Sequence, residues 1–225
     1  MKKMLRRLEE ENMEVEELDE ELDEEVDEEG ELFERDFMQM VIDEVNHKTL
    51  SIVGTFDTKM VSYVKTFVDN LWYYEDDDKR PLFVDISSHG GFASDLMAIL
   101  DLLDKAKKMW DCKIITRCVG YAESCGFILW CFGDEREMGE YSTLMCHKIS
   151  YGMNGSLDDH ESEFKRSKKV QEKIDKIIMK KTNITKKMLN KWYASGDKFI
   201  DYDEALELGL IEPEEEEENE DNKEE

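Results

Sequence analysis

Two kinds of hydrophobic pattern alternate along the middle of the chain. Short continuous apolar runs, typical of buried strands, occupy residues 49–54, 82–86, 113–119 and about 144–146. Apolar residues spaced at i, i+3 or i+4 and i+7 predict a helix over 58–74, ended by a loop at 75–81, and another whose buried face runs from Leu96 to Leu103. The order strand, helix, strand, helix, strand predicts an α/β fold with a parallel sheet and right-handed crossovers.

Helical patterns dominate the second half of the chain. A long charged helix with one apolar face is expected over about 157–181, and a shorter helix capped by Thr185 follows at about 185–193. The remaining elements are a short strand near 199–200, a last helix at 203–208, and an early apolar segment at 37–42 that fits either a strand or a docking segment.

Charge is distributed unevenly along the chain. The whole chain carries a net charge of −27, of which residues 1–31 contribute −12 and residues 212–225 contribute −9, so that −6 remains for residues 32–211. The middle therefore has an ordinary globular composition between two acidic ends. Such ends argue against binding to nucleic acid or to an anionic membrane.

This division predicts one globular domain of residues 37–212. An acidic N-terminal extension, 1–36, and an acidic C-terminal tail, 213–225, are expected to be disordered. Apolar residues between Met4 and Val26 leave open that the extension forms a helix on the apolar groove of a partner.

The cysteines and the hydropathy of the chain indicate the cellular compartment in which the protein is expected. The five cysteines form no Cys-x-x-Cys pair and leave an odd one over, and no apolar run approaches the roughly 18 residues of a membrane span. No secretory leader is recognisable, because acidic residues begin at Glu9 before any hydrophobic stretch. We therefore expect a reduced, cytoplasmic setting.

Candidate chemistry centres on Gly120-Tyr121-Ala122-Glu123-Ser124-Cys125-Gly126-Phe127. An apolar strand pattern precedes this stretch and a helix-compatible run follows it, which puts Ser124 on a strand-to-helix turn. Unpaired N–H groups at the start of the following helix suit a developing oxyanion, so a serine here can act as a nucleophile if a base reaches it. A serine that only caps the helix is the competing interpretation.

Four stretches agree in order and spacing with one known family. They are Ile86-Ser87-Ser88-His89-Gly90-Gly91, Gly120-Tyr121-Ala122-Glu123-Ser124-Cys125-Gly126, Met145-Cys146-His147, and the run from Asp197-Lys198-Phe199 to Gly209-Leu210-Ile211. Through these motifs, which span about residues 48–212, the chain resembles the proteolytic subunit of the Clp protease. The resemblance implies a crotonase-like α/β fold, a spiral of β-β-α units with a long protruding handle helix.

The resemblance also implies roles for individual residues. Ser124 would be the nucleophile, His147 the general base, and Asp197 the carboxylate that orients the histidine. Asp201 and Asp203 compete with Asp197 for the third role, although Asp-x-Phe directly before the closing helix favours Asp197.

Two backbone N–H groups would complete such a site. By the same resemblance, Gly91 and Cys125 would donate them to the oxyanion. Because the hole needs only backbone, the cysteine that stands where the family has methionine should be tolerated. The resemblance implies neither a cofactor nor a metal.

The expected partners also follow from the resemblance. The chain would form homo-oligomeric rings that stack through the helix at 157–181 and enclose a chamber, and an AAA+ ATPase unfoldase would thread unfolded proteins or peptides into it. The chain itself has no Gly-x-x-x-x-Gly-Lys-Ser/Thr nucleotide-binding loop.

Some residues depart from the family pattern. His89 replaces a proline before the glycine pair, Lys148-Ile149 replaces Gln-Pro after the histidine, and the N-terminal axial loop is not recognisable. Three alternatives therefore stay open: a non-catalytic ring or scaffold subunit, an acyl-CoA-handling crotonase relative, and a related self-assembling protease of the signal-peptide-peptidase or viral maturation type.

Overall fold

The computed structural model describes residues 28–71 and 80–213. The predicted disorder of 1–27 and 214–225, the end of the predicted helix at 72–74, and most of the predicted loop at 75–81 lie outside these residues. The elements are α2 (Glu28–His47), β1 (Thr49–Phe56), α3 (Thr58–Asn70), β2 (Leu82–Gly91), α4 (Ala93–Trp110), β3 (Ile114–Glu123), α5 (Cys125–Phe132), β4 (Glu135–Met138), β5 (Thr143–Cys146), α6 (Leu157–Lys181), α7 (Lys186–Ser195), β6 (Lys198–Ile200) and α8 (Tyr202–Glu207).

The strands form one mixed sheet in the order β1-β2-β3-β5-β6, in which only β6 runs antiparallel to its neighbour. One edge of strand β3 pairs with two different strands. Its first half pairs with β4, and its last residues, Tyr121 to Glu123, pair with β5. The parallel α/β fold expected from the pattern is thereby confirmed, and the carboxyl end of β3 lies directly beside the carboxyl end of β5.

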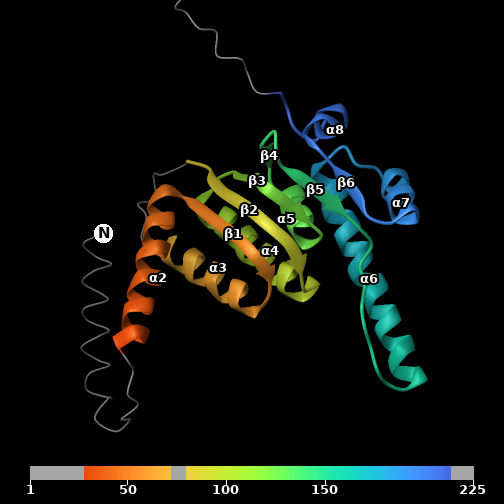
Figure 1. Ribbon diagram of the computed structural model, residues 1–225, viewed down its shortest axis with the longest axis horizontal. Coiled ribbons are helices and arrows are strands. Elements are labelled where there is room, and N and C mark those ends of the chain that lie inside the picture. Colours follow the sequence, from red (N-terminus) through yellow and green to blue (C-terminus); the bar gives the residue numbers. More distant parts are fainter. Residues whose placement is uncertain (1–27, 72–79, 214–225) are drawn as a thin grey trace, which may run out of the picture.

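One face of this sheet carries the hydrophobic core. Alternate residues of β2, such as Leu82, Val84 and Ile86, are buried, while the residues between them are partly exposed. Helices α3, α4 and α5 contact one another and the strands, so they form a single layer over that face (Figure 1). Helix α5 is apolar on every side, as expected of a helix inside the core, and seven of its eight residues are buried.

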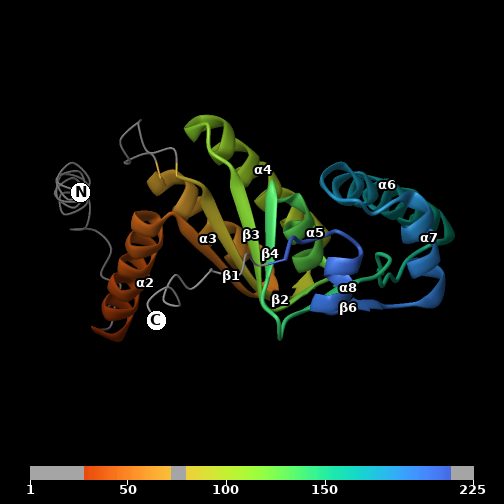
Figure 2. The ribbon, with the colours of Figure 1, turned by 90° about the horizontal axis from the view of Figure 1, so that it is seen from above.

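Helix α6 extends beyond the sheet, at the end of the molecule opposite to α2 (Figures 1 and 2). Ser156 and Asp159 form a capping box that begins the helix. No residue from Leu157 to Arg166 is buried, whereas Ile174 and Ile178 are buried where α6 contacts α5. The first half of α6 therefore protrudes, and its second half anchors it.

The early apolar segment at 37–42 is part of helix α2, not a strand. Val41 and Val45, four residues apart, are buried where α2 contacts α3 and β1. Because α2 begins at Glu28, residues 28–36 of the predicted disordered extension are helical as well. A six-residue apolar run does not distinguish helix from strand, and tertiary contact decides the outcome.

Three strands, β1, β2 and β3, extend beyond their predicted apolar runs, and one strand was not foreseen. Strand β2 continues past Ile86 to Gly91, and β3 continues past Val119 to Glu123, because pairing with neighbouring strands holds polar residues in the ladder. The register shifts between Val53 and Thr55 of β1, where β2 has one residue more than β1. The unforeseen strand β4 has the sequence Glu-Arg-Glu-Met, without an apolar run to reveal it.

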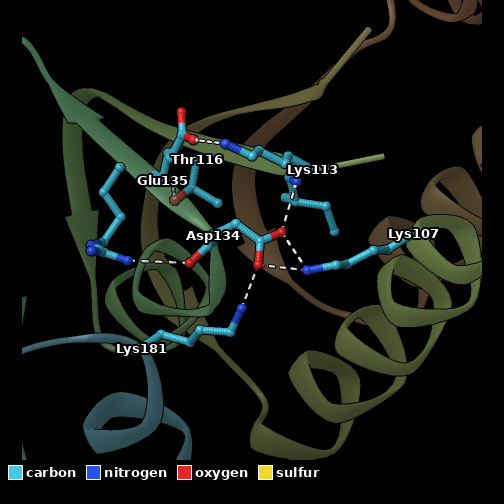
Figure 3. Close-up of polar contacts among 9 residues, drawn as sticks. Lys107, Lys113, Thr116, Asp134, Glu135 and Lys181 are labelled. Carbon is cyan, nitrogen blue, oxygen red and sulfur yellow. Dashed lines mark hydrogen bonds and ion pairs between the residues drawn. The ribbon is translucent and has the colours of Figure 1, made fainter. Parts of the chain in front are cut away.

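Asp134, which lies between α5 and β4, joins several elements through its side chain (Figure 3). Its carboxylate accepts hydrogen bonds from Lys107 of α4, from Lys181 at the end of α6, and from the backbone N–H of Ile114 at 3.0 Å. Burial by itself would raise the pKa of the Asp134 carboxyl, but these donors outweigh it and lower the pKa to about 2.

We expect Asp134→Asn to lower the free energy of unfolding at pH 7 by about 2 kcal/mol, the free energy that corresponds to a pKa nearly two units below its unfolded value. The folded pKa lies below the unfolded one, so this stabilisation is fully present above about pH 4 and is lost as the pH falls towards 2. Denaturant unfolding followed by circular dichroism between pH 2 and 7 measures the difference between variant and parent.

Glu135→Gln is the matched control, because Glu135 pairs with Lys113 on the exposed surface. It should change the stability little at any pH. A difference between Asp134→Asn and the parent that stays constant from pH 7 to pH 2 would contradict the assignment.

Candidate active site

Ser124 occupies the single residue between the end of β3 and the start of α5. Its backbone has φ 52° and ψ −113°, a left-handed conformation that is strained for a residue with a side chain. Its N–H donates to the carbonyl of Met145 at 2.9 Å, which fixes the turn to β5. The structure thus has the predicted strand-to-helix turn, and the turn is held by the neighbouring strand.

The hydroxyl of Ser124 does not cap the helix that it precedes, since its side chain makes no capping hydrogen bond with α5. Its Oγ lies 2.7 Å from Nε2 of His147 instead. A serine hydroxyl within hydrogen-bond distance of an imidazole is the arrangement that general-base activation of a nucleophile requires. The capping interpretation of Ser124 is therefore wrong.

His147 follows β5 directly, and the sheet explains its position. In the parallel pairing of β3 with β5, Glu123 lies opposite Met145. The next residues along the two strands diverge into the Ser124 turn and the loop that begins with His147. Two residues 23 positions apart in the sequence are thus brought together by three adjacent pairs in one ladder.

Asp197 directly precedes β6, the strand that pairs with β5. In the antiparallel pairing of β5 with β6, Cys146 lies opposite Lys198, so the next position of the ladder puts Asp197 opposite His147. Across residues 28–71 and 80–213, however, no hydrogen bond or ion pair joins the two, and Asp197 is exposed.

The competing aspartates have other places in the fold. Asp201 is the N-cap of α8, and its side chain accepts a hydrogen bond from the Glu204 N–H at 2.9 Å. Asp203 lies in the first turn of that helix. Of the three candidates, only Asp197 is adjacent to His147 in the strand register.

The two glycines at the end of β2 are packed so tightly that neither tolerates a side chain. A methyl group added to Gly90 would lie 2.7 Å from Cβ of Ser124, and one added to Gly91 would lie 2.4 Å from the carbonyl oxygen of Phe56. Both glycines also have positive φ, 103° and 156°. Both glycines belong to a motif singled out in the sequence, in which only Gly91 was given a role, and Gly90 packs directly against Ser124.

The N–H directions at this point suit an oxyanion. The N–H of Phe92 donates to Phe56 of β1 at 2.9 Å. The hydrogen bond from β2 to Phe56 thus uses the N–H of Phe92 and not that of Gly91, the residue paired with Phe56. Cys125 begins α5, so its N–H is among those left without a partner inside the helix.

The side chain of Cys125 joins these two donors. Its Sγ–H donates to the carbonyl oxygen of Gly91 at 3.3 Å. Burial raises the pKa of the Cys125 thiol to about 11, so at neutral pH it is not a thiolate that competes with Ser124 as a nucleophile.

His89, the residue in the place of the family's proline, points into solvent. Its ring stacks on Tyr121 at a centroid distance of 4.0 Å, and Nδ1 lies 2.6 Å from Oε2 of Glu123. Glu123 directly precedes Ser124, so this pair bridges the ends of β2 and β3 on the outside of the site. No charge pattern in the sequence indicated the bridge, because the two residues are 34 positions apart.

A buried polar network that no sequence pattern indicated lies behind His147. The N–H of Ile149 donates to Gln171 at 2.8 Å, and Gln171 and Tyr193 both donate to the carboxylate of Asp175, which also binds Lys186. Burial, then nearby Cys146 and Asp175, raises the pKa of the Tyr193 phenol. The network ties the segment after His147 to helices α6 and α7.

A cleft of about 740 Å³ opens between that segment and the two helices. Its lining includes the apolar side chains of Ile149, Tyr151 and Phe164 and the edge of the polar network. The lining begins at Lys148, directly after His147, but neither His147 nor Ser124 is part of it.

Within residues 28–71 and 80–213, no three His, Cys, Asp or Glu side chains are grouped to hold a metal ion. No helix there is long and apolar enough to span a bilayer.

The sequence of this chain is similar to those of known proteins. The family model described as Clp protease matches residues 35–214. The chain is 34% identical over 143 residues to the ATP-dependent Clp protease proteolytic subunit 2 of Bacillus licheniformis, an alignment that covers 63% of this chain and 73% of that protein.

Because the added methyl group would displace Ser124 itself, we expect Gly90→Ala to reduce the rate at which Ser124 reacts with a small activated ester by about 100-fold or more, the loss typical of a misplacement near 1 Å. Stopped-flow measurement of the burst of ester cleavage reports this rate.

Gly54→Ala controls for backbone strain, since Gly54 also has positive φ, 94°, but an added methyl group there meets nothing within 4 Å. It should leave the burst rate within a few-fold of the parent. Equal loss of rate in both variants would mean that strain, and not contact with Ser124, explains the effect.

Proposed function

The chain belongs to the Clp protease family, and from this we propose that it is a serine endopeptidase that hydrolyses unfolded polypeptides, with Ser124, His147 and Asp197 as its triad. The observation that carries the proposal is the 2.7 Å contact between Ser124 Oγ and His147 Nε2, made by a serine in a strained turn before an apolar helix. Strain of this kind persists where the surrounding structure enforces it, commonly at reactive residues.

In the proposed reaction, His147 Nε2 takes the hydroxyl proton as Ser124 Oγ attacks the carbonyl carbon of the peptide bond. The carbonyl oxygen becomes an oxyanion, which accepts hydrogen bonds from the N–H groups of Gly91 and Cys125. When the C–N bond breaks, His147 returns the proton to the leaving amine. Water then hydrolyses the acyl-Ser124 ester by the same proton transfers in turn.

Asp197 would hold His147 in the tautomer whose Nε2 accepts the serine proton. This role requires the Asp197 carboxylate to reach Nδ1 of His147. The two residues follow the last pair of the β5–β6 ladder, so a local movement there would bring them together. Hydrogen bonds between catalytic groups are commonly long in an unliganded site and tighten when substrate binds. We propose that substrate or assembly closes this contact.

A homo-oligomeric ring is part of the proposal. Leu157 and Phe164 on the protruding half of α6 are 88% and 59% exposed, which favours contact with another copy over solvent. The relative's name includes ATP dependence, and this chain has no nucleotide-binding loop. A separate AAA+ unfoldase would therefore supply unfolded substrate, and we expect the assembly to act in the cytoplasm.

One observation favours a second candidate, a non-catalytic ring subunit. Within residues 28–71 and 80–213, Asp197 makes no hydrogen bond to His147, and such a gap would slow catalysis if it persisted in the assembled state. Turnover by the assembled protein separates the two candidates.

We expect Asp197→Asn to lower kcat for a fluorogenic peptide by roughly 10²- to 10⁴-fold with little change in KM, because loss of the orienting carboxylate affects the proton transfer and not binding. Ser124→Ala should abolish cleavage of both the peptide and an unfolded protein.

Asp201→Asn is the matched control, since asparagine also caps helices well. It should retain the parent's kcat. A loss in Asp201→Asn equal to that in Asp197→Asn, or an unchanged kcat in Asp197→Asn, would remove Asp197 from the mechanism.

A further inference from the structure

A strongly basic surface stands out in this acidic protein. Residues 165–191 hold 11 basic and 2 acidic side chains, a net charge of +9 in a chain whose total is −27. They form the second half of α6 and the first part of α7, which lie side by side at one end of the molecule (Figure 2).

Four of these residues form a stripe along one face of α6. Lys169, Lys173, Lys176 and Lys180 are spaced at i, i+4, i+7 and i+11, so their side chains lie one above another. The buried residues of α6 lie on the opposite face, among them Gln171, Ile174 and Ile178. All four lysines of this lysine stripe are exposed.

The lysine stripe has no acidic partners among the described residues. Lys165, Lys181 and Lys186 each form an ion pair, but none of the four stripe lysines does so within residues 28–71 and 80–213. Like charges three and four residues apart destabilise a helix. A partner that brings carboxylates to this face would therefore stabilise α6.

The chain passes the C-terminal end of α6 shortly before the acidic segment 212–225 begins beside β4. The carbonyl of Gly209 accepts a hydrogen bond at 3.0 Å from Asn183, which lies two residues after the end of α6. Residues 212–225 hold 10 acidic and 1 basic side chains, a net charge of −9 that matches the +9 of the basic surface.

The length of the segment suffices to reach the whole stripe. From Lys169 to Lys180 the helix rises roughly 16 Å, at about 1.5 Å per residue. The segment spans up to about 45 Å when extended, at roughly 3.3 Å per residue. The other acidic segment, 1–31, leads into α2, which lies at the opposite end of the molecule (Figure 1).

We infer that segment 212–225 docks along the lysine stripe of α6 in the same chain. Several carboxylates then face four lysines, and the attraction acts at short range across a solvated surface, so it weakens as salt increases. The interaction requires the charge of the stripe but no particular residue order in the segment. It is independent of the proposed reaction at Ser124.

Glutamyl endopeptidase digestion of the full chain, carried out in a Ser124→Ala background, tests the docking. Cleavage within 214–218 should be roughly fivefold or more slower in the parent than in the variant K169Q/K173Q/K176Q/K180Q, because cleavage follows the undocked population. In 0.5 M salt the two rates should converge.

Two comparisons make the test specific. The control K59Q/K65Q/K105Q/K108Q removes four exposed lysines from α3 and α4 and should digest like the parent. Glutamates within 1–27 serve as an internal reference. Equal cleavage within 214–218 in the parent and the stripe variant, or a change confined to 1–27, would overturn the inference.

Carbodiimide cross-linking of the full chain identifies the contact directly. Links from carboxylates of 214–225 should form with the lysine stripe and not with Lys59 or Lys105, and in a mixture of ¹⁴N- and ¹⁵N-labelled protein they should join residues of one chain. Links that form only between chains would assign the surface to a second copy and contradict docking in the same chain.

Discussion

The left-handed backbone of Ser124 is the constraint on which the site depends. A residue with φ 52° turns the chain sharply from β3 into α5, and the hydrogen bond from its N–H to Met145 holds that turn against β5. Because that hydrogen bond holds the Ser124 turn against β5, it also brings His147, the residue after β5, within reach of the serine hydroxyl. On the other side, only a glycine at position 90 leaves room for the Ser124 side chain. Strain, strand pairing and close packing thus converge on one hydroxyl group.

Sequence patterns anticipated the parts of this arrangement that depend on local chemistry. The apolar run before Ser124 and the apolar helix after it indicated the turn, and helix α6 has the bounds that its periodicity predicted. Thr185 caps α7 as expected, by accepting a hydrogen bond from Met188. These features depend on residues that are close to one another in the sequence.

Features that depend on distant contacts were not predictable. The strand β4 and the ends of β2 and β3 contain polar residues, and only pairing with other strands makes them extended. The bridge from His89 to Glu123 and the network around Asp175 join positions that no periodicity relates. The net charge of −6 for the middle of the chain also concealed a local surplus of +9, which becomes a surface only when α6 and α7 pack together. Helix α6 is proposed to contact the same helix of another copy, and the positive charge of the lysine stripe would repel that copy. An acidic segment docked on the stripe would reduce this repulsion.

The central claim is that Ser124 is an activated nucleophile. Its most direct test is to treat the folded, assembled chain with a fluorophosphonate probe and to map the modified residue by mass spectrometry, with Ser124→Ala and His147→Ala as controls. The account predicts modification at Ser124 that is absent in the first variant and at least about 100-fold slower in the second, as expected when a general base is removed. A folded, assembled protein that takes up no probe, or takes it up equally without His147, would contradict the account.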